Sequence, residues 1–347
     1  MLVALAVTAG AGVISVRADD DPSLPPIDAQ RLLASALEAS ADGVTISGDV
    51  QTTIDLGLPD LPASFGGDAG ASGVLASLTG DQRWKVWSSP DGLRVAHLLP
   101  AREQDLVVNH DEAWWWDSAE LRAVHLDLAG LRESMMPVVP SSTGSPVPSV
   151  DPVFLARTLI RGISPCASVT VQGTERVAGR DAYVLALIPL VRASLVGSIR
   201  VSIDAETRLP LRVEVRSSGG DEAPIAAGFT SVSFDAIDPG MFTFAPPPGA
   251  AVRDAADVAD EVGGEAGGDP NGPAGLPTIT DAQVLGNCLG VVVAVRLDGP
   301  VPSTAARLLP FAGPLSSVIA VDRGDHAWVL AGLVDTEALE ARAATLP

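Results

Sequence analysis

Few residues in this chain have the type and spacing that catalysis requires. The run from Gly286 to Gly290 has the small-residue frame of a hydrolase nucleophile elbow, with Cys288 at the nucleophile position. That motif needs a strand before it and a helix after it, whereas an apolar strand is expected to follow here. No phosphate loop, dinucleotide fingerprint or paired-carboxylate signature is present. The four histidines are isolated from one another: His97, His110, His125 and His326. We therefore expect a protein that is not an enzyme.

Metal and cofactor binding are not indicated either. Cys166 and Cys288 are not in a metal-type spacing. The run from His110 to Glu112 could bind a cation weakly, but it is typical of a solvated turn. The acidic segment 254–269 lacks the spaced ligands of a calcium loop. We expect no metal and no cofactor.

The strongest single candidate for a binding site is the tryptophan triplet at residues 114–116. Side chains alternate faces along a strand, so Trp114 and Trp116 share one face and Trp115 takes the other. An inward-facing pair could form the floor of an apolar cavity, and an outward-facing pair could mark a partner surface. Plain core packing is the alternative.

The elements that would position these residues are strands. Between Arg180 and Phe244 apolar and polar residues alternate with period two, which predicts a sheet with one wet and one dry face. Ile199 and Val201 oppose Arg200 and Ser202, for example. Such a dry face must be covered by protein or by a ligand.

The pattern predicts helices at 28–40 and 151–162, with Asp28 as the N-cap of the first. Strands are expected at 44–56, 83–88, 93–99, 103–109, 112–117, 123–128, 168–177, 181–188, 197–204, 210–217 and 225–236. About ten or eleven antiparallel strands in one meander are too many for a flat sheet. We expect an α+β fold: a strongly curved antiparallel half-barrel covered by helices and by the 57–80 loop.

Composition and charge restrict the partners. The chain has 347 residues, a formal net charge of −21, and 47% hydrophobic residues. Nucleic acid is excluded as a partner of the surface as a whole, because phosphate binding needs a basic footprint.

The N-terminal residues indicate export, and the C-terminal residues indicate a further folded segment after a linker. Residues 1–17 are apolar enough for a signal peptide or a membrane anchor, which indicates an extracytoplasmic protein. In that compartment Cys166 and Cys288 could form a disulfide, although two buried free thiols remain an equal alternative. Residues 251–278 are expected to be an acidic flexible linker, and residues 279–347 a small C-terminal α/β segment.

Residues 28–250 resemble the extracytoplasmic lipoprotein-carrier fold (LolA/LolB-like), and actinobacterial LolA-domain proteins in particular, a fold related to RseB/MucB-type sigma-factor regulators. The resemblance is carried by segments 177–185, 199–210, 228–234 and 238–247, the second ending in Asp-Ala-Glu-Thr-Arg-Leu-Pro. It implies an incomplete barrel around a hydrophobic cavity, and a carrier that binds acyl chains of lipids or lipoproteins. It also implies a cavity-lining arginine, which the sequence does not assign.

The leading expectation is therefore a non-enzymatic carrier of acyl chains, and the alternative is an envelope sensor that regulates an anti-sigma factor by protein–protein interaction. A lipoprotein transporter is a further conceivable membrane partner. The expected cavity residues are apolar positions on strands and on the loop: Leu61, Phe65, Leu75, Val86, Val95, Leu106, Trp114, Trp116, Leu185, Ile199, Val201, Leu211 and Val213.

Overall fold

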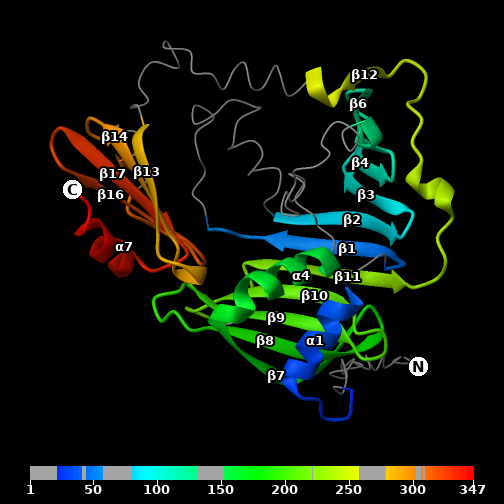
Figure 1. Ribbon diagram of the computed structural model, residues 1–347, viewed down its shortest axis with the longest axis horizontal. Helices are drawn as coiled ribbons and strands as arrows, with labels where there is room; N and C mark the ends of the chain where they lie inside the picture. The colour runs from blue at the N-terminus through cyan, green and yellow to red at the C-terminus, as the bar shows by residue number, and fades with distance from the viewer. Residues whose placement is uncertain are drawn as a thin grey trace, which may run out of the picture.

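The protein consists of two β-sheets and a few helices in a computed structural model (Figure 1). The structure describes residues 22–40, 44–57, 80–130, 152–220, 222–257, 279–301, 306–307 and 309–347. The large sheet has 12 strands in the order β12-β6-β5-β4-β3-β2-β1-β11-β10-β9-β8-β7, and the small sheet has five in the order β13-β14-β17-β16-β15. The result is a mainly-β α+β fold.

The large sheet joins two runs of antiparallel hairpins at one pairing. The first run comprises β1 (Ile46–Ile54), β2 (Gly80–Ser89), β3 (Gly92–Leu99), β4 (Arg102–Asn109), β5 (Glu112–Asp117) and β6 (Arg122–Asp127). The second comprises β7 (Ala167–Val177), β8 (Arg180–Pro189), β9 (Val196–Asp204), β10 (Pro210–Ser217) and β11 (Ile225–Ser233). Because β1 pairs with β11, the two runs form one sheet.

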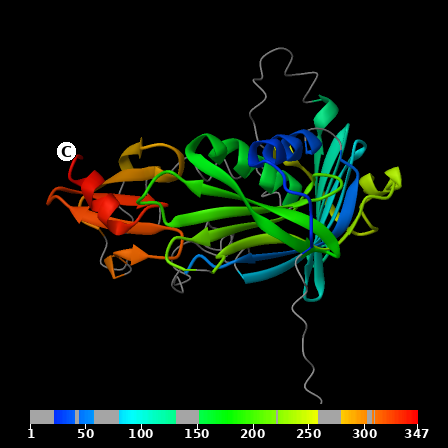
Figure 2. The same ribbon diagram turned by 90° about the horizontal axis from the view of Figure 1, so that it is seen from below.

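The expectation of a strongly curved antiparallel half-barrel of ten or eleven strands is corrected in its strand number, its strand directions and its curvature. β12 (Ala251–Asp254) adds a twelfth strand, and it runs parallel to β6. It lies where the acidic linker was expected to begin. The sheet is also open, since β12 and β7 are its edges. In Figure 2 the cyan strands stand across the green ones, as accumulated strand twist produces.

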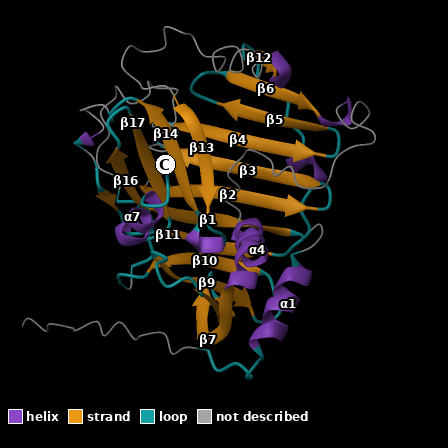
Figure 3. Cartoon of the chain, turned by 60° about the vertical axis from the view of Figure 1, so that its left-hand side comes forward, coloured by secondary structure: helices purple, strands orange, loops and turns teal. Residues whose placement is uncertain are grey.

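Two helices pack on the same face of the large sheet (Figure 3). Helix α1 (Ala29–Ala39) begins after Asp28, whose side chain accepts a hydrogen bond from the Arg31 N–H, so the predicted N-cap is confirmed. Helix α4 (Pro152–Ile163) has proline at its first position. Both helices are amphipathic, and their apolar stripes are the reason they lie on the sheet's dry face.

The small sheet comprises β13 (Ile279–Leu285), β14 (Val292–Asp298), β15 (Phe311–Ala312), β16 (Ser317–Asp322) and β17 (His326–Gly332). Helix α7 (Thr336–Ala343), capped by Asp335, covers one of its faces. The short 3-10 turns η2 (Ser164–Cys166), η3 (Pro239–Phe242) and η4 (Cys288–Gly290) complete the described elements.

The two sheets are joined covalently and by backbone hydrogen bonds. Cys166 and Cys288 form a disulfide with their Cα atoms 6.1 Å apart, which decides between the two alternatives left by the sequence. The Leu195 N–H donates to the Leu333 carbonyl at 2.9 Å, and the Asp335 N–H donates to the Ala193 carbonyl at 3.0 Å. Within the described residues no helix is long and apolar enough to cross a membrane.

Candidate functional site

The apolar face of the large sheet is the candidate site, and strand register shows which residues share it. In the first run Val86 pairs with Val95, Val95 with Leu106, and Leu106 with Trp115. In the second run Val213 pairs with Val201, and Val201 with Leu185. Directly paired residues lie on the same face. We call this surface the dry face; β1 and β11 connect its two parts through the pair Val50 and Phe229.

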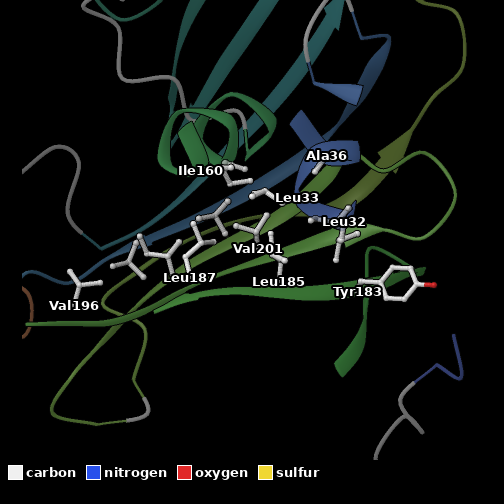
Figure 4. Packing of buried hydrophobic residues seen from close by; sticks show 14 of the residues in the cluster. Leu32, Leu33, Ala36, Ile160, Tyr183, Leu185, Leu187, Val196 and Val201 are labelled. Atoms are coloured by element: carbon white, nitrogen blue, oxygen red, sulfur yellow. The ribbon is translucent and has the colours of Figure 1, made fainter. Parts of the chain in front are cut away.

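The first part of the dry face, over β7 to β10, is sealed by protein. Leu32 and Leu33 of α1 and Ile160 of α4 are buried against it (Figure 4). The strand residues beneath them are almost fully inaccessible: Leu185, Leu187, Ile199, Val201 and Val213. We call this part the helix-covered half. Its close packing leaves these five side chains with protein neighbours, as in an ordinary core.

The second part, over β2 to β6, is less covered by the described residues. Val86 and Val95 are buried, in one cluster with Val153 of α4. Further along the same row Leu106 and Trp115 are only half-buried. We call this part the tryptophan half. An arginine borders it, because the Arg122 guanidinium lies 5.4 Å from the Trp115 ring centroid.

Trp114 and Trp116 lie on the opposite face of the sheet. Trp116 pairs with Asp105 and Trp114 with Val107, one residue out of phase with the dry face. Both tryptophan rings pack against Phe244, at centroid distances of 5.5 Å and 5.8 Å. The expectation that these two line the same surface as Val86 and Leu106 is therefore corrected. Their cover is the chain segment that follows β11.

A buried carboxylate on the tryptophan half is held by several donors. Asp117 accepts hydrogen bonds from Arg102 and Gln104 side chains, both at 2.8 Å, and from the N–H groups of Ala119 and Glu120. Burial alone would raise the pKa of Asp117, but the hydrogen bond from Gln104, those two N–H groups and the Arg102 charge together lower it. Asp117 thus stays charged and fixes Arg102 on the dry face.

His97 lies beside this carboxylate as a neutral group. Its ring stacks on Trp84 with centroids 3.7 Å apart, and its Nε2 lies 2.8 Å from the Gln82 side-chain oxygen. Burial lowers the pKa of His97, a hydrogen bond with Gln104 opposes this, and the Arg102 charge lowers it further. A neutral imidazole is compatible with an apolar surface.

The wet face of the second run carries ion pairs in place of a cavity. Asp204 is fully buried and accepts from Arg180 Nε at 2.6 Å and from Arg180 Nη2 at 3.0 Å. Burial would raise the pKa of Asp204, but the Arg180 hydrogen bonds and those from Thr207 and the Glu206 N–H lower it. The same contacts raise the pKa of Arg180. The predicted alternation of polar and apolar faces is confirmed on β10, whereas on β9 the polar-face residues Ser202 and Asp204 are themselves buried.

The predicted cavity residues are thus separated into four groups, of which Trp114 and Trp116 on the opposite face are one. Val86, Val95 and Leu106 join the tryptophan half, and the buried positions on β8 to β10, including Leu211, join the protein core. Leu61, Phe65 and Leu75 lie outside the described residues. Sequence reasoning missed Trp115 and the Asp117 cluster. The sequence showed that Trp115 faces away from Trp114 and Trp116. It did not show which residues of other strands share the face of Trp115, because that depends on the register between strands.

One part of the chain matches the model of a known protein family. Residues 156–236 match the model of the MucB/RseB N-terminal domain. This region is MucB/RseB-like. It runs from within α4 to just beyond β11, and so contains the strands of the helix-covered half. No curated protein matches the chain.

Solved structures with weak similarity to this chain include MucB and LolA-like proteins. The MucA/MucB complex of Pseudomonas aeruginosa is 15% identical, with a TM-score of 0.45, and the match covers 91% of this chain and 96% of that one. A LolA superfamily protein from Nitrosomonas europaea is 14% identical, with a TM-score of 0.25 over 63% of this chain and 99% of that one. The Mycobacterium tuberculosis lipoprotein LppX is 13% identical, with a TM-score of 0.27 over 58% and 94%.

Proposed function

We propose that the protein is a non-enzymatic, extracytoplasmic regulator that binds the extracytoplasmic segment of a membrane-anchored anti-sigma factor. The observation that carries the proposal is the match of residues 156–236 to the MucB/RseB N-terminal domain. The disulfide between Cys166 and Cys288 supports an oxidising compartment. We prefer a regulator to an acyl-chain carrier because α1 and α4 already cover the most apolar part of the dry face.

The small sheet offers a surface on which a protein could dock. Helix α7 covers the face that carries Val292 and Leu330. On the other face Val284 pairs with Val293, and Val293 with Ala331. At one end of this face Ala327 is fully buried and Asp322 is charged. The rest of the face on the four main strands is apolar, and none of these residues is fully buried: Ala282, Val284, Val293, Val295, Val318, Ala320, Val329 and Ala331. We call it the valine face.

Exposure singles out the valine face as an interaction surface. Val284 is 71% exposed and Val293 is 43% exposed. Contiguous exposed apolar residues on a soluble protein mark interaction sites more often than single ones do. Among the described strands β13 is also an edge of the small sheet, and an edge strand has one side to which a further strand can pair. A partner strand or helix with an apolar stripe would bury this surface.

The test is a binding assay with the soluble extracytoplasmic segments of the host's anti-sigma factors. We expect one of them to bind the full-length protein in biolayer interferometry. The double variant Val284→Asp/Val293→Asp should weaken that binding by at least about tenfold, since each charge must be desolvated in the interface. Val252→Asp is the matched control, because Val252 is 51% exposed on β12 of the large sheet. The proposed regulator function is wrong if no such segment binds.

An acyl-chain carrier is the second candidate, and the tryptophan half is the observation that favours it. Leu106 and Trp115 form a half-exposed apolar surface bordered by Arg102 and Arg122. An acyl chain laid on such a surface gains about 0.8 kcal/mol per buried CH₂ group. The arginines could bind a carboxylate or phosphate head group at its end.

This candidate predicts that organic-solvent extraction of the purified protein yields lipid. Trp115→Ala should reduce the recovered lipid several-fold, because it removes the largest apolar side chain of the surface. Trp114→Ala, which acts on the opposite face, should leave the recovery unchanged. Extracts without lipid from repeated preparations would exclude the carrier function and leave the regulator function untouched.

A further inference from the structure

A hollow lies on the wet face of the large sheet where β1 meets β2 and β11. Figure 1 shows these three strands side by side. Its volume is about 310 Å³, at the lower end of the range of small-ligand sites. It is lined by Ser47, Gly48, Asp49, Lys85, Trp87, Ser231, Val232 and Ser233. None of these residues belongs to the valine face, and Val232 is the one among them that packs against the dry-face cluster of Val86 and Val153.

The backbone forms the hollow through a bulge. Gly48 pairs with Val232 and Asp49 with Ser231, but Val50 pairs with Phe229, so Thr230 is an extra residue on β11. Bulges redirect side chains and are common at sites. Glycine is required at position 48, because a Cβ there would clash with the Ser231 carbonyl oxygen. The close approach of β1 and β11 therefore depends on this glycine.

One side of the hollow is formed by the indole ring of Trp87, which a side chain of the neighbouring strand β3 contacts. Trp87 pairs directly with Ser47 on β1 and with Arg94 on β3. The Arg94 guanidinium lies 5.7 Å from the Trp87 ring centroid, and it is itself fixed by an ion pair to the buried Asp105 at 2.5 Å. A cation on an aromatic ring restricts the ring's motion. Trp87 is thereby presented as a preorganised flat platform.

Apart from Gly48 and Val232 the remaining lining is polar, and the charges of Lys85 and Asp49 balance each other. Lys85 Nζ lies 4.0 Å from the Asp49 carboxylate, and both side chains are about half exposed. The Ser231 hydroxyl donates to Asp49 Oδ2 at 2.7 Å. Serine hydroxyls both donate and accept hydrogen bonds, whereas Lys85 only donates and Asp49 only accepts. A charged ligand would meet one repulsive partner of this pair, but an uncharged ligand with several hydroxyls would meet none.

From these features we infer that the hollow binds a saccharide unit. The apolar C–H face of a sugar ring would lie on the Trp87 indole, and its hydroxyls would exchange hydrogen bonds with Asp49, Lys85 and Ser47. Saccharides combine one apolar ring face with hydroxyls that both donate and accept, which is the combination that this lining offers. In an extracytoplasmic protein such a site faces the glycans of the cell envelope.

The inference is tested on the full-length protein with three soluble trisaccharides: chitotriose, maltotriose and mannotriose. Isothermal titration calorimetry and saturation-transfer NMR should detect binding of at least one of them at millimolar concentration. Trp87→Leu should weaken this binding by at least about tenfold, and Ser47→Ala should weaken it about threefold. Trp115→Leu is the matched control, because it removes a half-buried tryptophan from the opposite face, and it should leave binding unchanged.

Three outcomes would overturn the inference. The first is that none of the three trisaccharides binds the folded wild-type protein. The second is that Trp87→Leu, with its circular dichroism spectrum unchanged, binds as tightly as the wild type. The third is that inorganic phosphate or citrate competes with the sugar, which would assign the hollow to anions. None of these outcomes bears on binding of an anti-sigma segment, which is measured separately.

Discussion

The two halves of the dry face have the same alternating sequence pattern and different environments. In the helix-covered half Leu185 and Val201 are inaccessible beneath α1 and α4. In the tryptophan half Leu106 and Trp115 occupy equivalent positions in a strand row but remain half-exposed. Alternation therefore defines a face that avoids water, and the elements laid over that face decide whether it is core or surface.

The difference extends to how each half is anchored. The helix-covered half is tied to the small sheet by the disulfide at Cys166 and by the pairing of Ser194 with Val334. Buried Asp204 also fixes its outer face. One half of the dry face is thus cross-linked and covered, whereas the other has apolar side chains that the described residues leave partly accessible.

The largest expected effect concerns the disulfide. Cys166→Ser/Cys288→Ser opens a cross-link between residues 122 positions apart. In the chain-entropy model a loop of that size contributes about 4.7 kcal/mol, and measured values are often smaller. We expect a loss of about 4 kcal/mol in the free energy of unfolding by urea. An unchanged unfolding midpoint would show that the anchoring of the helix-covered half does not depend on this bond.

The next effect compares two leucines directly. Leu185→Ala should cost about 3 kcal/mol, because it leaves a cavity under α1 and α4. Leu106→Ala should cost less than about 1.5 kcal/mol, because water already reaches that side chain. Urea unfolding of the two variants side by side measures the contrast. Equal losses would mean that the two halves are equally sealed.

A third prediction uses the two buried carboxylates, Asp204 and Asp117, one in each run of strands. Each has a folded-state pKa below the ordinary value of 3.8. The stabilisation from each is therefore present above that value and is lost as the pH falls through the lower folded-state pKa. Asp204→Asn and Asp117→Asn should each cost on the order of 2 kcal/mol at neutral pH, less than a fully buried pair because Arg180 and Arg102 retain contact with water.

Urea unfolding between about pH 6 and pH 2 measures this dependence. Each variant should lose less stability on acidification than the wild type does, since one of the carboxylates that must be protonated is absent. A variant whose stability falls as steeply as that of the wild type would show that its carboxylate contributes nothing to acid unfolding.

The smallest effect belongs to His97 in the tryptophan half. Its folded-state pKa is lower than the ordinary 6.5, so the unfolded chain binds more protons just below that pH. The wild type should lose less than about 1 kcal/mol as the pH falls below 6.5, and His97→Gln should lose less over the same interval. The unfolding midpoint at about pH 7.5 and pH 5.5 provides the measurement. Identical losses would contradict burial of the neutral imidazole.

Most strands could be predicted from alternation alone. The segments 112–117 and 210–217 coincide with β5 and β10, and the predicted helix start at Asp28 is correct. β13 was not predicted, because only its Val284 and the two ends are strongly apolar and most of the strand is exposed. β12 was not predicted either, because a four-residue edge strand bears no recognisable period.

The candidate site was predictable only in part. The sequence analysis correctly predicted that Val86, Val95 and Leu106 lie on strands. It also predicted that Trp114 and Trp116 line the same surface, but these two lie on the opposite face of the sheet. Parity within one strand is fixed by covalent geometry. Parity between strands depends on register, which is set by turns and bulges such as the one at Asp49.

The sequence by itself determined that this protein has an extensive sheet with a wet and a dry face, because alternation of side chains is a property of each strand alone. The tertiary structure decided that helices seal one half of the dry face, that Trp115 and not its neighbours shares the other half, and that Cys166 bonds to Cys288. These facts depend on contacts between residues far apart in the chain, and such contacts exist only once the strands have paired and the helices have packed.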